Sequence, residues 1–83
     1  MPRYFFDTDD GADRFQDDEG MDLPDARSAR DAAVGSLPEL SRDRLADGDH
    51  HRLTVRVRDE AGALVYSATL DLVGEWHVPQ ARP

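Results

Sequence analysis

The chain has 83 residues, with ten Lys and Arg against eighteen Asp and Glu, and its formal net charge is −8. A chain of this length folds as one domain with a thin core, and without cysteine it has no disulfide, thiolate zinc site or cysteine nucleophile. The acidic field repels phosphate backbones, and no apolar segment approaches the ~20 residues that span a bilayer. We therefore expect a cytoplasmic protein that binds neither nucleic acid nor membranes.

Aromatic residues dominate the first segment, residues 2–7, which reads Pro-Arg-Tyr-Phe-Phe-Asp. This composition predicts a strand that carries an aromatic side chain on each face. After an acidic turn at Gly11, residues 14–17 predict a short returning strand. The N-terminal third therefore contributes the first two strands of a sheet.

The acidic surplus gathers in two loops around Gly11 and Gly20. Carboxylate oxygens bind hard cations such as calcium and magnesium, so these loops suggest a divalent-cation site. Anchored on either glycine, however, the calcium-loop pattern places a phenylalanine at its first ligand position. We interpret the loops as solvated turns and assign no metal site, while a cation site in loops 7–19 stays the alternative. Its candidate ligands are Asp7, Asp9, Asp10, Asp17 and Glu19.

A helix is predicted from about Pro24, because proline suits the first helical turn. Apolar residues then recur at three- and four-residue spacing, which favours one face packed on a sheet. Pro38 removes a backbone hydrogen bond, and Ser36 with Glu39 has the form of a capping box. We therefore predict a kink or restart near residues 35–36, with the helix continuing to about Ala46.

Residues 52–72 predict an antiparallel hairpin. Aliphatic residues alternate with polar ones in its first half, so one face is buried and the other shows Arg52, Arg56 and Arg58 to water. The Asp-Glu-Ala-Gly sequence at residues 59–62 predicts the turn, because Asp bonds its own backbone and Gly adopts positive φ. The three arginines are candidate contacts for a protein partner.

The last ten residues, 74–83, contain prolines that disfavour regular structure and one tryptophan, Trp76. Trp76 either folds back over the edge of the core or anchors in a partner's pocket, and it is the fourth candidate interaction residue. The histidines do not suggest a zinc site, because His50 and His51 project to different sides of a strand and His77 is distant.

These elements predict an α+β fold with the order ββαββ. Two strands alone are marginal in water, so the hairpin joins the N-terminal strands in a four-stranded, mostly antiparallel sheet with one kinked helix packed on one face. Residues 1–73 form a single compact domain, and residues 74–83 form a C-terminal tail.

The opening Met-Pro-Arg-Tyr-Phe-Phe, the D-E-G-x-x-L-P segment at residues 18–24 and the Val-Arg-Asp-Glu-Ala-Gly segment at residues 57–62 are distinctive. With them, the chain resembles a family of short uncharacterised bacterial proteins that is described as a domain of unknown function. The resemblance runs from residue 1 to about residue 72. It implies one compact domain in a cytoplasmic setting and supplies no activity, substrate or catalytic residue.

Catalysis requires positioned acids, bases or nucleophiles in a cleft, and the sequence offers neither a glycine-rich phosphate loop nor a serine with a plausible histidine partner. We expect that the chain is not an enzyme and has no cofactor. The leading hypothesis is a small acidic protein-interaction module, regulatory or antitoxin-like, that binds another protein or forms a homodimer through an exposed strand edge. The alternative is divalent-cation binding by loops 7–19.

Overall fold

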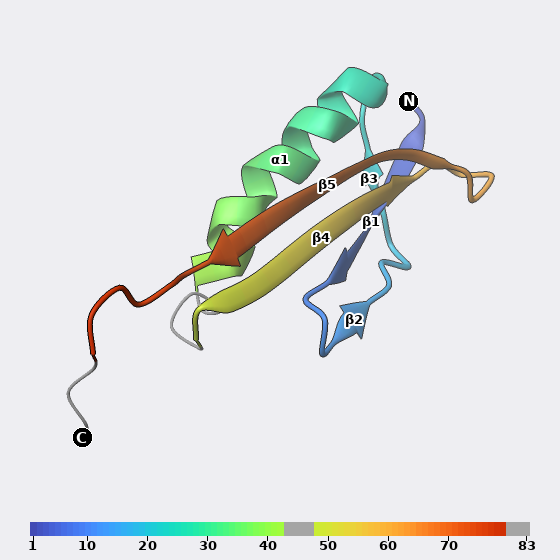
Figure 1. The fold of residues 1–83 in the computed structure, drawn as a ribbon. Helices are drawn as coiled ribbons and strands as arrows, with labels where there is room; N and C mark the ends of the chain where they lie inside the picture. The colour runs from blue at the N-terminus through green and yellow to red at the C-terminus, as the bar shows by residue number, and fades with distance from the viewer. Residues whose placement is uncertain (43–47, 80–83) are drawn as a thin grey trace.

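The computed structural model describes residues 1–42 and 48–79. The elements follow in the order β1 (Arg3–Asp9), β2 (Arg14–Phe15), β3 (Met21–Asp22), α1 (Ala26–Arg42), β4 (His50–Arg58) and β5 (Leu64–Val73). They form one antiparallel sheet with α1 along one face (Figure 1). The predicted α+β class is therefore confirmed. Within the described residues, no helix is long and apolar enough to span a membrane.

The sheet has the order β2-β1-β4-β5, with β3 also paired to β1. Both short strands lie on the same side of β1. There β2 pairs with the end of β1 and β3 pairs with its start. The sequence predicted four strands and placed Met21–Asp22 in a turn, whereas the structure adds it as a fifth strand. Two residues are too few to show the alternation that reveals a strand.

The core lies between α1 and the sheet. The predicted alternation in β4 is confirmed, since its three aliphatic side chains are buried on the helix side. Alanines on α1 allow the helix to approach the sheet closely, and Tyr4 contributes the buried aromatic side chain of β1. The buried hydrophobic residues are Tyr4, Ala29, Ala33, Leu37, Leu53, Val55 and Val57.

Asp25 caps the start of α1. Its Oδ1 accepts a hydrogen bond from the backbone N–H of Ser28 at 2.8 Å. This bond lowers the pKa of the Asp25 carboxyl below its ordinary value. A charged cap at the positive end of the helix dipole stabilises the first turn. The helix therefore begins at Ala26, directly after the capping residue Asp25.

The predicted restart near residues 35–36 is wrong, because α1 runs without interruption through Pro38 to Arg42. Ser36 does not cap a second helix; its Oγ donates a hydrogen bond to the carbonyl of Ala33 at 2.7 Å. Leu37 and Ser41, on either side of Pro38, are both buried. Packing of this face on the sheet outweighs the local break signals. The predicted end near Ala46 lies outside the described residues.

The hairpin turn between β4 and β5 has the predicted chemistry. Asp59 Oδ1 accepts hydrogen bonds from the backbone N–H groups of Ala61 and Ala63, both at 2.9 Å. Gly62 has φ of 86°, the left-handed conformation that glycine adopts at no steric cost. Local sequence alone therefore determines this turn.

Gly20 lies just before β3, where the loop packs against two side chains of β1. Its φ is 75°, and a Cβ atom at this position would lie 2.8 Å from Arg3 Cγ and 2.9 Å from Phe5 Cε2. Glycine is needed here for two reasons, the backbone conformation and the close approach to two side chains. The D-E-G segment thus has a structural requirement at its third residue.

Substitution of this glycine tests the close approach. Gly62 has a similar φ, but a Cβ atom added there would have no neighbour within 4 Å, so it isolates the conformational cost. We expect Gly62→Ala to lower the free energy of unfolding by about 1–2 kcal/mol, the cost of a left-handed residue. Gly20→Ala should cost more than Gly62→Ala in urea denaturation, because Phe5 must also move. An equal loss of unfolding free energy in the two variants would contradict the close approach of Gly20 to Arg3 and Phe5.

Candidate interaction surfaces

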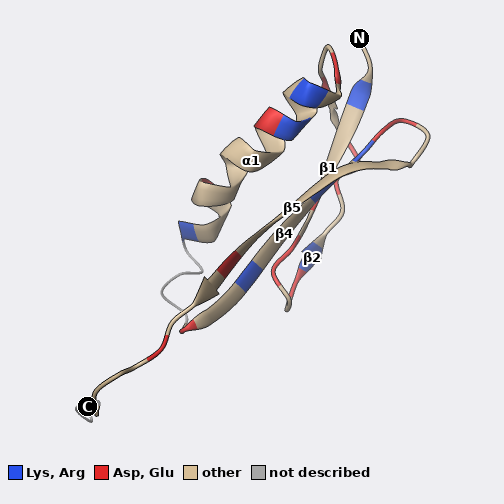
Figure 2. Ribbon diagram, turned by 45° about the horizontal axis from the view of Figure 1, so that its top comes forward, with Lys and Arg blue, Asp and Glu red and all other residues tan. Residues whose placement is uncertain are grey.

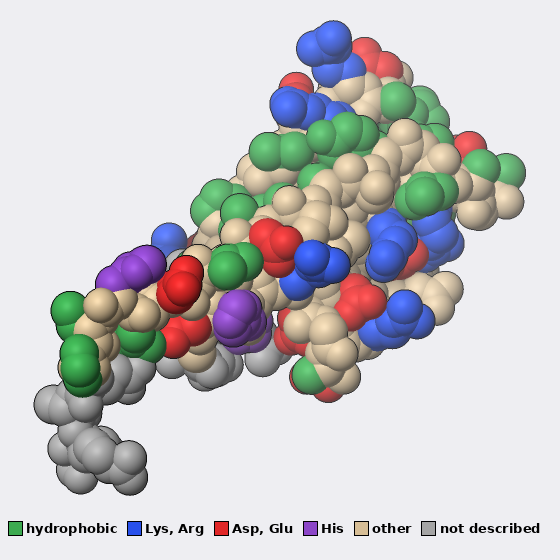
Figure 3. Space-filling view, viewed as in Figure 1, with side chains coloured by type: hydrophobic (Ala, Val, Ile, Leu, Met, Phe, Trp, Pro, Cys, Tyr) green, Lys and Arg blue, Asp and Glu red, His purple; other side chains and the backbone are tan. Residues whose placement is uncertain are grey.

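The sheet face opposite α1 is polar and carries all three arginines that the sequence singled out. Arg52, Arg56 and Arg58 lie at same-face positions of β4, facing acidic and hydroxyl side chains of β1 and β5. Figure 3 shows Arg and Asp side chains next to one another over this part of the molecule. We call this surface the open face.

Arg58 connects three segments at one end of the open face. Its Nε and Nη2 donate to the two carboxylate oxygens of Asp7 at 2.6 and 3.0 Å, and Nη2 also donates to the carbonyl of Asp17 at 2.9 Å. The guanidinium carbon lies 5.1 Å from the ring centroid of Phe5. The Arg58 and Asp7 side chains are only 24% and 23% exposed, so solvent screens this pair less than an ordinary surface pair.

Asp17 takes the place of a strand beside the middle of β1. Its Oδ2 accepts from the backbone N–H of Phe6 at 3.1 Å, and its Oδ1 accepts from those of Glu19 and Gly20 at 3.0 and 3.1 Å. Its own N–H donates to Asp7 Oδ1 at 3.0 Å. The Asp17 side chain therefore satisfies the Phe6 N–H on the edge of β1 between β2 and β3, where strand pairing is interrupted.

Both carboxylates of this cluster are held in the charged form. The hydrogen bond from Arg58 lowers the pKa of Asp7, although partial burial opposes it. Partial burial raises the pKa of Asp17, but the backbone donors of Phe6, Gly20 and Glu19 outweigh it, so the pKa lies below its ordinary value. Charge and hydrogen bonding thus favour the same folded arrangement.

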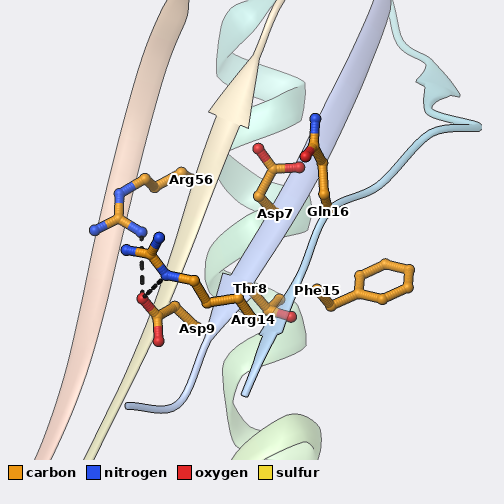
Figure 4. Close-up of a pocket in the computed structure, with 7 residues that line it drawn as sticks. All are labelled: Asp7, Thr8, Asp9, Arg14, Phe15, Gln16 and Arg56. Atoms are coloured by element: carbon orange, nitrogen blue, oxygen red, sulfur yellow. Dashed lines mark hydrogen bonds and ion pairs between the residues drawn. The ribbon is translucent and has the colours of Figure 1, made fainter. Parts of the chain in front are cut away.

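The other two arginines of β4 are more exposed. Arg52 pairs across the hairpin with Asp71, with donor–acceptor distances of 3.2 and 3.0 Å. Arg56 and Arg14 converge on Asp9, at 3.9 and 3.0 Å (Figure 4). Among the three candidate arginines, Arg56 has the longest ion pair, and its side chain is about half exposed.

Four of the five predicted cation ligands use their carboxylates in bonds within the chain. Asp7, Asp9 and Asp17 make the contacts described above, and Asp10 Oδ1 accepts from the backbone N–H groups of Ala12 and Asp13 at 3.0 and 2.7 Å. Figure 2 shows acidic residues in the loops as well as on α1 and β5. Over residues 1–42 and 48–79, no three His, Cys, Asp or Glu side chains are arranged to hold a metal ion.

β5 forms the edge of the sheet opposite to β2. It has ten residues, and β4 is its one strand partner in the described structure. Its large apolar side chains are unusually exposed: Leu64, Val65, Leu70 and Val73, the last at 70%. On the helix side of β5, Tyr66 and Ala68 pack against the core.

The tail after β5 leaves the body of the domain (Figure 1). Trp76 is 61% exposed and Val78 is similarly exposed, so the tail does not bury its apolar residues against the core. Trp76 therefore does not fold back over the core in the described structure, and its role as an anchor for a partner stays a prediction. The tail extends the apolar surface of β5 beyond the end of the strand.

A third surface was missed by the sequence interpretation. Phe15, Met21 and Leu40 are exposed on the helix side of the sheet, beside β1. Together with Phe6 and Ala32 they line a groove between α1 and the β1–β3 region. Leu40 has the three-residue spacing from Leu37 that is typical of the buried helix stripe, but it is exposed and faces this groove. In the sequence, Phe15 of the short strand β2 is the residue that could have indicated this third surface.

A family model described as Domain of unknown function (DUF6894) matches residues 3–71. The chain belongs to this family. Comparison with curated proteins and with solved structures gave no match. The family's description states no activity, so function must be inferred from the surfaces of the domain.

The distinctive segments of the sequence meet in one place in the structure. Arg3, from the opening segment, has its Nε 3.1 Å from Asp22 Oδ1 and donates from Nη1 to the carbonyl of Glu19 at 2.8 Å. Gly20 lies against Arg3 and Phe5. These segments therefore hold the N-terminal strands together.

Removal of the Asp7 charge tests the Arg58 cluster. We expect Asp7→Asn to lower the free energy of unfolding at neutral pH by about 1.5–3 kcal/mol, because a partly buried charged hydrogen bond is lost. Asp71→Asn is the matched control, since the Arg52–Asp71 pair is cross-strand but exposed, and we expect a loss of at most about 1 kcal/mol. Urea denaturation measures both, and equal losses would contradict the assignment.

The same pair predicts a pH dependence. The folded pKa values of Asp7 and Asp17 lie below those of the unfolded chain, which are about 3.9. The unfolded state therefore binds more protons in acid, and the stabilisation, complete above the unfolded pKa, is lost as pH falls through the folded pKa values. The difference in unfolding free energy between wild type and Asp7→Asn should shrink below about pH 4. A difference that does not change with pH would mean that the charge is not its source.

Proposed function

We propose that the chain is a small acidic protein-interaction module that pairs with a second copy of itself along β5. The observation that carries this proposal is the outer edge of β5, which has ten residues, four exposed large apolar side chains and one strand partner in the described structure. A long exposed edge offers unpaired backbone groups to another strand. We propose a cytoplasmic setting and no catalytic activity.

The edge lacks the features that usually prevent strands from pairing. Proline, lysine and arginine do not occur in β5, and its one charged residue, Asp71, is already bonded to Arg52. The register irregularity of the hairpin lies at its turn end, between Val57 and Arg58, and leaves residues 66–73 regular. Protected edges instead carry charges, prolines or central bulges.

The open-face residues of β5 are nearly palindromic in their chemistry. In an antiparallel pair with Thr69 opposite its own copy, Val65 lies opposite Val73, and Ser67 lies opposite Asp71. These pairs are apolar with apolar and hydroxyl with carboxylate, and each favours the contact. A symmetric dimer requires such a self-complementary surface.

The helix-side residues of β5 follow the same symmetry. Ala68 lies opposite Leu70, and Tyr66 lies opposite Leu72, so every cross-strand pair on this face is apolar. Antiparallel pairing also brings the tail of each copy, with Trp76, next to the hairpin turn of the other copy. The exposed tryptophan then gains a surface to contact.

Pairing along β5 leaves the open face available to a further protein. Arg56, with Arg52 and Arg58, is the contact that we propose for an acidic partner surface. A regulatory or antitoxin-like role rests on the small size and negative charge of the chain, which is an argument by analogy.

Lysines on β5 test the pairing. We expect wild type to have about twice the 9.3 kDa chain mass in light scattering coupled to size exclusion. Val65→Lys with Val73→Lys should give the monomer mass, because the two lysines of one copy lie opposite those of the other. Both residues are exposed, so the fold is retained, which the circular dichroism spectrum checks.

Ala12→Lys with Gln16→Lys is the matched control, because it makes the same change in charge at exposed positions near the opposite edge of the sheet. This variant should keep the dimer mass. A monomeric wild type at every concentration, or dimers in both variants, would contradict pairing along β5.

The alternative function, divalent-cation binding by loops 7–19, has its own test. A ligand that binds only the folded state raises the melting temperature. Because Asp9 and Asp10 already bond within the chain, we expect calcium or magnesium at millimolar concentration to leave the Tm unchanged relative to chelator. A rise that Asp9→Ala with Asp10→Ala abolishes would favour the alternative.

A further inference from the structure

One helix does not cover this sheet. Neighbouring strands lie about 4.8 Å apart, and a helix with its side chains is about 10 Å wide, so one helix covers about two strands. Here α1 packs mainly on β4 and β5. The helix side of β1 beyond Tyr4, together with β2 and β3, is left with partly exposed apolar side chains.

The groove beside α1 marks this uncovered half. The sheet contributes Phe6 and Val55 to it, the short strands contribute Phe15 and Met21, and α1 contributes Leu40 along one side. Phe15 is 63% exposed and Met21 is 50% exposed, although both are large apolar residues. A second apolar helix face beside α1 would complete the layer.

The border of the groove is acidic. Asp17 lines the groove itself, and Asp10 and Asp13 line the adjoining hollow that shares Phe15 and Leu40 with it. Among the residues that line these two hollows, the one basic side chain is Arg14, and its Nε lies 3.0 Å from Asp9 Oδ2. The field at the groove therefore favours a segment that carries positive charge.

The described residues of a second copy do not supply such a segment, because their helix is α1. The apolar stripe of α1 is already buried against its own sheet through Ala29, Ala33 and Leu37. We infer that the groove binds an amphipathic helix of another protein, with apolar residues on one face and Lys or Arg at its flanks. Such a helix inserts apolar anchors beside α1, as in helix-in-groove recognition.

A synthetic helix is the probe. A labelled Leu/Lys peptide of about 14 residues, patterned with one apolar face, spans about 21 Å and matches the length of most of α1. We expect it to bind the full chain in fluorescence anisotropy and to shift amide resonances of residues 15, 21, 32, 36 and 40. A scrambled peptide of the same composition has no apolar face, and it should bind at least about tenfold more weakly, a difference of about 1.4 kcal/mol.

Variants with unchanged net charge distinguish binding in the groove from attraction of the basic peptide to the acidic chain as a whole. Phe15→Ser with Met21→Ser should weaken binding at least about tenfold, whereas Val65→Ser with Val73→Ser, which removes apolar groups from β5, should leave it within about twofold. Melting curves check that wild type and both variants are folded. Equal binding of the two peptides, equal binding of the two variants, or resonance shifts confined to β5 would overturn the inference.

Discussion

The bidentate pair between Arg58 and Asp7, with Asp17 bonded to both, is the interaction on which the N-terminal half of this fold depends. On one side β1 pairs with β4 over Phe5 to Asp9, whereas on the other side β2 and β3 each pair with two of its residues. Asp17 fills the gap between them with its side chain and is itself held by Asp7 and Arg58. Without this cluster the loop that contains Asp17 loses its hydrogen bonds to β1, and it is then held by the short pairings of β2 and β3 and by the contacts of Arg3.

The same cluster explains what the distinctive segments of this family member do. Arg3 and Phe5 from the opening segment contact Gly20, and Phe5 also lies beside the guanidinium of Arg58. A substitution at Gly20 therefore reaches β1 and β4 through side-chain contacts alone. These contacts are structural, so the segments themselves indicate no activity and function must be inferred from the surfaces around them. The open edge of β5 lies outside this cluster, whereas the groove beside α1 shares Asp17 with it.

The sequence predicted those parts of the fold that local chemistry determines. Alternation identified both strands of the hairpin, and Asp59 with Gly62 identified its turn, because the bonds involved join neighbouring residues. The predicted restart of the helix is wrong because burial of Leu37 and Ser41 against the sheet outweighs the local effect of Pro38. The candidate arginines were correctly placed on one face, but their partners were not predictable, since Asp7 and Arg58 are 51 residues apart. The groove depends on where α1 lies across the sheet, which no local pattern encodes.

Charge distribution makes the two proposed contacts compatible. Residues 1–25 hold nine acidic residues against two arginines, and they form the β2 and β3 side of the sheet, whereas β5 holds one acid that is bonded to Arg52. Two copies of a chain with net charge −8 repel each other, and the repulsion is smallest when their least charged edges meet. Pairing along β5 therefore places the acidic edges at the two ends of the joined sheet. There the grooves remain accessible, and each faces solvent with the negative field that attracts a basic helix.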